Sequence, residues 1–246
     1  MSLIPKKIHY CWFGGKEKPK LVKECIKTWK EKMPNYEIIE WNEKNFDVNK
    51  IRFTKEAYEN KKWAFVADYC RNWVLYNYGG IYLDTDMEVL KPLDRFLEDN
   101  SFAGVEDDEN INAAIWGCKK GDKFVKLILN YYEMINFEDY KQDLFSLAIP
   151  KIITKIAKEN GYNKSITPTN FYNKTVIYPK EYFYPKRKSW EKEIVTKNTY
   201  TIHHYDGSWR SKNQIFFSNI KKVMVKFIGI KKANLLVDFI KGRVKK

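Results

Sequence analysis

The pattern of apolar and polar positions predicts a chain in which strands alternate with helices. Short runs of β-branched and aromatic residues at 7–13 and 36–41 indicate strands. Segment 19–32 is a lysine-rich helix candidate closed by Pro34, and 63–78 is the strongest helix candidate. This alternation favours an α/β sandwich around a central sheet.

Later parts of the chain continue the same alternation. Gly79 stands where a left-handed residue would end the 63–78 helix. Beyond Gly161 the sequence is aromatic and proline-containing, so we expect irregular structure until a last strand. The further expected elements are strands at 81–84, 87–90, 101–106, 112–117 and near 199–203, and helices near 54–60, 122–135 and 143–159.

Polar or flexible residues follow two of the predicted strands. Gly14 and Gly15 come directly after the first strand, and Asp84-Thr-Asp86 follows the apolar run that begins at Ile81. In open α/β sheets, ligands bind at the carboxyl ends of the strands. Both segments therefore mark the edge of the sheet where a site is expected.

Asp84 and Asp86 are candidate ligands for a divalent cation. Two carboxylates at i and i+2 can converge in a turn, and hard oxygen ligands suit Mn²⁺ or Mg²⁺. A cation at this position could neutralise the charge on a departing diphosphate. The same spacing also occurs in ordinary acidic turns. A phosphatase of the Asp-x-Asp-x-Thr/Val type is set aside, because Glu88 occupies the position that Thr or Val would take.

Asp68 and Arg71 form a second candidate group. At i and i+3 on the 63–78 helix they share one face. Their neighbours at helical spacing, Ala64, Ala67 and Leu75, are apolar, so the pair is expected to be partly buried. A buried carboxylate–guanidinium pair can grip sugar hydroxyls and a phosphate. A purely structural ion pair fits the residues equally well.

Adjacent histidines near the last strand form a third candidate group. His203 and His204 would face opposite sides of a strand, so only one could reach a given cation. We expect His204 and Ser208 to complete the coordination sphere of the acidic pair. The alternative is a core histidine followed by a surface turn.

Charge and composition narrow the class of protein. The formal net charge is +14, and ten Lys and Arg residues with one acid lie within 212–246. Lysines alternate with apolar pairs at 219–246, which predicts amphipathic helices on an anionic membrane surface, or else a solvated basic end. A nucleic-acid-binding protein is the rival class, but no zinc-finger, RNP or helix-turn-helix signal supports it.

Cysteine spacing and hydropathy set the expected location. The four cysteines have no CxxC spacing and lie among apolar neighbours, so we expect reduced core thiols. The first residues lack the long apolar stretch of a signal peptide, and no run reaches the length of a membrane span. We therefore expect a cytoplasmic protein. If the segment at 219–246 binds the membrane, we expect the protein to lie on its inner face.

Four segments together resemble glycosyltransferase family 32. They are IPKKIHYCWFGG at 4–15, ADYCR at 67–71, YGGIYLDTD at 78–86 and His-x-x-x-Ser-Trp at 204–209. The family includes capsule-assembly enzymes, initiating mannosyltransferases and the catalytic domains of large glucosylating toxins. The resemblance covers most of residues 4–210. It implies a GT-A type nucleotide-sugar-binding domain at 1–210, with 211–246 as a basic helical appendage.

The resemblance also implies a reaction and roles for particular residues. The implied reaction is the retaining transfer of a hexose or N-acetylhexosamine to a saccharide or lipid-linked acceptor in surface polysaccharide synthesis. UDP is favoured over GDP in the donor. Trp12 would contact the base, and Trp209 would cap the diphosphate. Asp68 and Arg71 would hold the donor sugar, Tyr82 and Asp84 would contact the sugar or ribose, and Asn112 would lie near the reacting carbon. Mn²⁺ would be bound by Asp86, His204 and Ser208.

Two departures from the family pattern concern the substrates. Ala67 stands where serine is common, and the 140–150 segment lacks the Gly-Pro step of relatives. No further carboxylate stands out as a covalent nucleophile, so front-face attack is the expected mechanism. A non-catalytic nucleotide-binding protein on the same fold is the remaining alternative. The intact Asp84, Asp86 and Arg71 argue against it.

Overall fold

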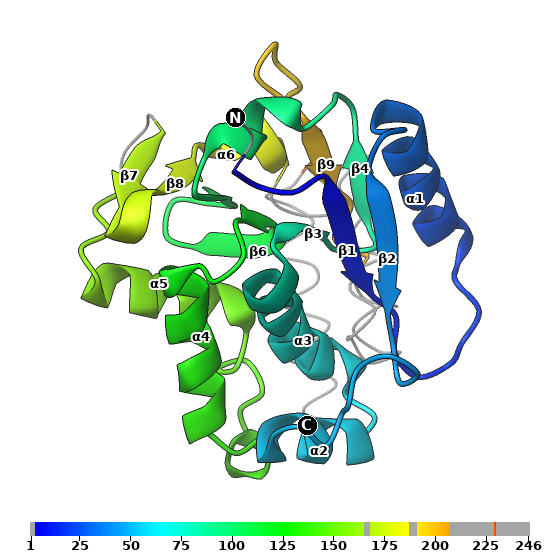
Figure 1. The fold of residues 1–246 in the computed structure, drawn as a ribbon, viewed down its shortest axis with the longest axis vertical. Coiled ribbons are helices and arrows are strands. Elements are labelled where there is room, and N and C mark those ends of the chain that lie inside the picture. The colour runs from blue at the N-terminus through cyan, green and yellow to red at the C-terminus, as the bar shows by residue number, and fades with distance from the viewer. Residues whose placement is uncertain (1–2, 165–167, 187–190, 207–228, 230–246) are drawn as a thin grey trace.

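A mixed seven-stranded sheet forms the centre of the computed structural model, which describes residues 3–164, 168–186, 191–206 and 229. The strand order is β2-β1-β3-β6-β5-β8-β7, and β4 and β9 form a separate antiparallel pair (Figure 1). The strands are β1 Lys7–Cys11, β2 Glu37–Trp41, β3 Gly80–Leu83, β4 Met87–Val89, β5 Ser101–Val105, β6 Ile111–Cys118, β7 Thr169–Phe171, β8 Thr175–Tyr178 and β9 Thr201–His203.

Strands β2, β1 and β3 run parallel, so their carboxyl ends share one edge of the sheet. Cys11 pairs with Trp41, and His9 pairs with Tyr82. Continued by two residues, this register brings Cys11, the last residue of β1, level with Asp84, the first residue after β3. The edge predicted for a site from Gly14-Gly15 and the acidic pair is therefore a single edge.

His9 fastens these three strands together beneath the site. It is fully buried, and its Nε2 lies 2.8 Å from the carbonyl oxygen of Gly79. Trp41 Nε1 donates to His9 Nδ1 at 3.1 Å, so Nε2 carries the proton that bonds Gly79. Burial lowers the pKa of His9 to about 4 and outweighs the raising effect of the Gly79 hydrogen bond. The ring is neutral at neutral pH and fixes where β3 begins.

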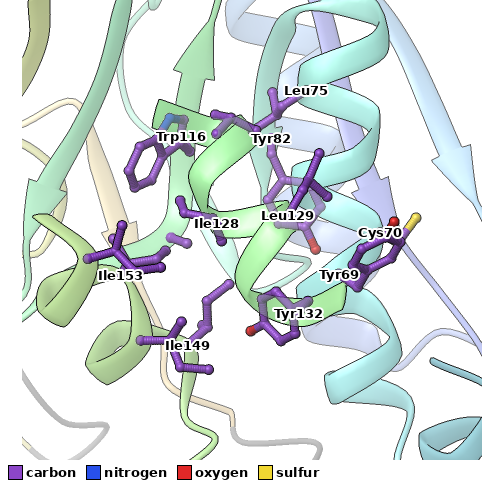
Figure 2. Close-up of a cluster of buried hydrophobic side chains, with 14 of the residues drawn as sticks. Tyr69, Cys70, Leu75, Tyr82, Trp116, Ile128, Leu129, Tyr132, Ile149 and Ile153 are labelled. Carbon is purple, nitrogen blue, oxygen red and sulfur yellow. The ribbon is translucent and has the colours of Figure 1, made fainter. Parts of the chain in front are cut away.

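Four helices cover one face of the sheet and enclose the larger core. They are α2 Arg52–Glu59, α3 Trp63–Tyr78, α4 Lys123–Met134 and α5 Ile149–Glu159. Figure 2 shows the centre of this core, where side chains from α3, α4 and α5 meet residues of β3 and β6. Tyr82, Trp116 and Tyr132 are among its largest fully buried side chains. Such large buried aromatic groups hold the helices firmly on the sheet.

The other face is covered by α1 Lys20–Lys32, the β4–β9 pair and α6 Lys180–Phe183. Helix α1 buries Val22, Cys25 and Trp29, which recur at helical spacing, and exposes lysines on its outer side. Trp29 Nε1 donates to the backbone oxygen of Met87 at 2.7 Å. This bond ties α1 to β4, the strand that follows the acidic turn.

Most elements predicted from the sequence are confirmed, and the helix at 63–78 has the predicted bounds. Gly79 ends that helix with a positive φ of 65°, as predicted, although its ψ of −177° differs from that of a left-handed helix. Helix α5 begins at Ile149 instead of 143, because Pro150 is accommodated best in a first turn. The segment predicted as irregular after Gly161 contains β7, β8 and α6.

Two further predictions concern the cysteines and the chain beyond the sheet. The four cysteines are free and buried, as expected for core thiols. Within the described residues, no helix is long and apolar enough to cross a membrane. The predicted appendage at 211–246 lies outside the described residues apart from position 229.

Candidate active site

The acidic turn lies between the main sheet and the β4–β9 pair. The backbone nitrogen of Asp84 donates to Ala114 of β6 at 2.8 Å, and Met87 N donates to the Asp84 oxygen at 3.0 Å. The turn is therefore held at both ends by backbone hydrogen bonds. The Asp84 side chain is 27% exposed, while that of Asp86 is 13% exposed. Asp84 thus offers an oxygen to solvent, and Asp86 points toward β9.

Helix α3 brings Asp68 and Arg71 to this turn, as predicted for a shared helical face. Arg71 Nη2 donates to Asp68 Oδ1 at 2.7 Å, and Arg71 Nη1 lies 3.1 Å from Asp84 Oδ1. Both side chains of the helical pair are more than nine-tenths buried. The guanidinium group thus links the helix to the acidic turn, which an isolated helical ion pair would not do.

Arg71 is held from two further directions. Its Nη1 donates to the backbone oxygen of Ala113 at 2.8 Å, and its Cζ lies 4.6 Å from the centre of the Tyr82 ring. Tyr82 is 1% exposed, so its ring supports Arg71 within the core and does not face open space. The expected contact of Tyr82 with sugar or ribose stays a prediction.

Burial controls the charge of Asp68. Loss of solvent raises the pKa of this carboxyl to about 7, and the positive charge of Arg71 only partly offsets it. The charge of Asp84 raises the pKa further. At neutral pH, Asp68 consequently sits near the midpoint of its titration, which is characteristic of functional sites.

The β9 segment closes the other side of the acidic turn. His203 Nε2 lies 3.2 Å from Asp86 Oδ1, and the backbone nitrogen of Asp206 donates to Asp86 Oδ2 at 2.8 Å. Burial raises the pKa of Asp86, but the charge and hydrogen bond of His203 outweigh it and bring the value down to about 2. Asp86 is accordingly ionised across the physiological range.

His203, not His204, is the histidine that faces the acidic pair. The two adjacent side chains point in opposite directions, as predicted for a strand, and His204 Nε2 lies 2.9 Å from Glu88 Oε2. The choice of His204 for this position is therefore corrected by the structure. The orientation of the two histidines follows from the register of β9 on β4, in which His203 pairs with Met87. Ser208 and Trp209 lie outside the described residues.

Three of these side chains could hold a divalent cation together. One ligand atom from each of Asp84, Asp86 and His203 lies within 4.8 Å of the others. His203 Nδ1 is buried, and no hydrogen-bond partner for it is found among the described residues. The two carboxylates suit Mn²⁺ or Mg²⁺, the imidazole nitrogen favours Mn²⁺ of the two, and positions are left for phosphate oxygens. The residues present fit the expected cation.

Strand β6 bends where it meets the site. Ala103 of β5 pairs with Trp116, but the next residue, Gly104, pairs with Asn112, so residues 113–115 bulge out of this ladder. The bulge directs the oxygens of Ala113 and Ala114 to Arg71 and Asp84. Bulges commonly re-aim groups beside active sites in this way. The sequence carried no signal for it.

A buried tyrosine hydroxyl fills the gap that the bulge leaves. Tyr184 Oη donates to the Asn112 oxygen at 3.2 Å and accepts from Ile115 N at 3.1 Å. The ring is fully buried, and it lies edge-on to His203 at a centroid distance of 6.0 Å. The Tyr184 hydroxyl therefore makes hydrogen bonds to the bulged backbone of β6 in place of a partner on β5.

We expect Tyr184→Phe to fold but to lower activity. Removing the hydroxyl leaves Ile115 N and the Asn112 oxygen unpaired, at a cost of about 1–3 kcal/mol in the free energy of unfolding. The loosened bulge would misplace the Ala113 oxygen that holds Arg71. Urea unfolding and nucleotide release from a sugar donor measure the two effects. Activity equal to wild type, despite the lower stability, would contradict a positioning role.

Residues 19–103 match the sequence family described as a glycosyltransferase sugar-binding region containing a DXD motif. The matched segment contains both the acidic pair and the helix that carries Asp68 and Arg71. This match covers less than half of the chain and shows a similarity to that DXD-containing region. The resemblance inferred from the sequence is therefore confirmed.

Curated relatives agree with this assignment of the sugar-binding region. Inositol phosphoceramide mannosyltransferase 3 of Schizosaccharomyces pombe is 30% identical over 131 residues, which are 50% of this chain and 36% of that protein. Lactosylceramide 4-alpha-galactosyltransferase of Mus musculus is 25% identical over 171 residues, covering 65% of this chain and 45% of that protein. The chain thus spans less than half the length of either relative.

A solved structure supports the fold around the sugar-binding region. The PaToxG glycosyltransferase superposes with a TM-score of 0.52 at 17% sequence identity, covering 63% of this chain and 69% of that one. The mixed seven-stranded sheet with helices on both faces is the predicted GT-A type fold. The nucleic-acid-binding alternative is not favoured by any of these relatives.

Two predicted residues lie at the borders of the sugar-binding region. Trp12 follows β1 at the shared edge, partly exposed, and its Nε1 donates to the Lys16 oxygen at 2.6 Å. Asn112 begins β6 on the opposite side of β3 and is 6% exposed. Its Oδ1 accepts from Ala114 N at 2.7 Å, so the amide is fixed in orientation. The expected contacts with base and reacting carbon stay predictions.

Proposed function

We propose that this chain transfers a hexose or N-acetylhexosamine from a nucleotide-diphosphate sugar to a hydroxyl of a saccharide or lipid-linked acceptor. The observation that carries the proposal is that a candidate cation site and a buried ion pair lie next to each other at one edge of the sheet. The cation-binding set of Asp84, Asp86 and His203 adjoins the buried Arg71–Asp68 pair through the 3.1 Å contact between Arg71 and Asp84. A UDP-sugar is the favoured donor.

The residues divide the work of binding the donor. Asp84, Asp86 and His203 would hold Mn²⁺ or Mg²⁺, which neutralises a diphosphate when bound. Arg71 supplies a fixed positive charge, because three acceptors and the Tyr82 ring already hold its guanidinium group. Such preorganised charge favours the departing diphosphate without further rearrangement. In this proposal Asp68 accepts a hydrogen bond from a sugar hydroxyl.

We propose front-face attack with retention of configuration. The acceptor oxygen forms a bond to the anomeric carbon as the bond from that carbon to the diphosphate oxygen breaks. The departing phosphate oxygen takes the acceptor's proton, so no protein base is required. Asp68 is engaged by Arg71, which argues against its acting as a free nucleophile. A trapped glycosyl adduct on any Asp or Glu would overturn this mechanism.

The test is nucleotide release from a panel of UDP- and GDP-sugars with Mn²⁺ in the absence of acceptor. We expect slow release from one donor, abolished by EDTA and restored by added Mn²⁺. Binding of UDP and GDP, measured by calorimetry with and without Mn²⁺, is the parallel readout for a protein whose turnover requires its acceptor. Absence of both release and Mn²⁺-dependent nucleotide binding would end the proposal.

The sites of action suggested by the sequence are also proposals. Membrane attachment through 219–246, a cytoplasmic location and a role in capsule or other surface polysaccharide synthesis rest on the pattern of that segment and on the family resemblance. The two curated relatives are named for glycosylating ceramide lipids. Those names are consistent with a lipid-linked acceptor for this chain.

A further inference from the structure

Glu106 is a carboxylate at the site edge to which the proposed reaction gives no role. It follows β5, and its backbone nitrogen donates to Asn110 at 3.0 Å. Its Oε2 accepts from Asn112 Nδ2 at 2.5 Å. Asn112 Oδ1 in turn holds Ala114 N, and the Ala114 oxygen holds the backbone of Asp84. Glu106 is thus connected to the acidic turn through the Asn112 side chain and the backbone of β6.

This carboxylate lacks the partners that usually accompany a partly buried charge. No lysine or arginine of the described residues makes an ion pair with it, and only Asn112 donates to it from a side chain. Burial raises the pKa of Glu106, which the hydrogen bond from Asn112 and the charge of His203 partly offset. Asn112 thus engages one carboxylate oxygen of Glu106, and the other oxygen can accept a hydrogen bond from a ligand hydroxyl.

A second polar group beside Glu106 is also incomplete. The Tyr205 hydroxyl is buried and has no hydrogen-bond partner among the described residues. Its backbone has φ 54°, an uncommon value for a residue with a side chain, and its ring centre lies 4.0 Å from that of His203. Burial and then the charge of Glu106 raise the pKa of the Tyr205 hydroxyl. The Tyr205 ring therefore lies against His203, one of the candidate cation ligands.

The order of strands indicates which part of a donor would reach Glu106. Trp12 lies after β1 on one side of β3, whereas Glu106 lies after β5, beyond β6 on the other side. A nucleotide sugar with its base near Trp12 and its diphosphate at the acidic pair would extend its sugar toward β6 and β5. A carboxylate would repel the phosphates, but it accepts hydrogen bonds readily from hydroxyl groups.

We propose that Glu106 is a specificity-determining residue that accepts a hydrogen bond from a hydroxyl of the donor's sugar, with Asn112 fixing its orientation. The proposal deepens the function proposed above and rests on it. Hydrogen bonds between a site and a particular hydroxyl discriminate strongly among sugars, because an analogue that lacks this hydroxyl leaves the buried group unpaired.

The test compares Glu106→Gln, Glu106→Ala and the control Glu109→Gln, an exposed glutamate three positions away. Gln retains one oxygen for Asn112 but presents an amide donor in place of the second oxygen. We expect kcat/KM for Mn²⁺-dependent nucleotide release to fall roughly 10- to 100-fold in both Glu106 variants and not in the control. The affinity for free UDP or GDP should stay within about twofold.

Deoxy analogues of the active donor identify the hydroxyl concerned. One analogue should be a poorer substrate than the parent donor for wild type yet equal to it for Glu106→Ala. An equal loss for every analogue, accompanied by weaker free-nucleotide binding, would show a structural role and overturn the proposal. Unchanged release with impaired transfer would assign Glu106 to the acceptor and overturn it also. A wild-type protein that binds no nucleotide with Mn²⁺ would instead overturn the proposed function itself.

Discussion

Asp86→Asn is expected to lower Mn²⁺-dependent nucleotide release by roughly three orders of magnitude. The ionised carboxylate of Asp86 is the most strongly fixed of the candidate cation ligands, since His203 and the backbone of Asp206 both hold it. Asparagine keeps the shape of the side chain but removes its negative charge. Release from the active donor and direct titration with Mn²⁺ measure the loss. Release within tenfold of wild type would contradict a cation site at the acidic pair.

The adjacent histidines provide a matched comparison for the same prediction. His203→Ala should weaken Mn²⁺ binding by at least about tenfold, because His203 stands beside Asp84 and Asp86. His204→Ala should change it little, because His204 contacts Glu88 instead. Both variants remove one imidazole from the same short strand end. The reverse ranking would favour His204, as first inferred from the sequence.

The two members of the Arg71–Asp68 pair are expected to affect stability in opposite directions. Arg71→Met leaves Asp68 buried without its cation, which should lower the free energy of unfolding by about 3–5 kcal/mol. Asp68→Asn leaves Arg71 with Asp84, Ala113 and an amide oxygen, so its contacts are kept. Both variants should lose nucleotide release, since the reaction requires the intact pair.

The stability effect of Asp68→Asn should depend on pH. The folded protein holds the pKa of Asp68 at about 7, above its ordinary value of 3.8, because the carboxyl is buried. The folded state therefore binds a proton more tightly than the unfolded chain. The stabilisation this gives is present below pH 4 and is lost as pH rises through 7. Asparagine has no such titration, so its advantage over wild type should grow between pH 5 and pH 8.

Thermal unfolding in EDTA at these two pH values measures the difference. We expect the stability advantage of Asp68→Asn over wild type to grow by about 2–3 kcal/mol between pH 5 and pH 8. Arg71→Met should be destabilised throughout and most strongly at pH 8. An Asp68→Asn protein that is less stable than wild type at pH 8 would show that the Arg71 attraction outweighs burial.

The sequence predicted the first half of the fold well because its elements have strong local signals. Helix 63–78 ends at Gly79, and the strand predicted at 7–13 is followed by Gly14 and Gly15. The second half depends on longer-range contacts. Strand β8 is a run of only four residues that pairs with β5, some 70 positions earlier. No local pattern distinguishes such a run from an irregular aromatic segment, so β7, β8 and α6 were missed.

The sequence predicted individual residues of the site better than it predicted which of them come together in the fold. Carboxylate spacing marked Asp84 and Asp86, and helical spacing brought Asp68 and Arg71 to one face. The choice between His203 and His204 required the register of β9 on β4. Adjacent residues of a strand face opposite sides, and the sequence does not show which of the two histidines faces the acidic pair. Glu106 and Tyr184 were overlooked because the β6 bulge that gives them a role arises only from strand pairing.

The pairing of β4 with β9 has a consequence for biosynthesis. The acidic turn is encoded near position 85, whereas His203, which completes the candidate ligand set, lies on β9 more than a hundred residues later. A nascent chain emerges from its amino-terminal end, so the main sheet can assemble while the ligand set is still incomplete. The growing chain therefore acquires its full ligand set only when β9 docks, which separates folding of the scaffold from maturation of the site.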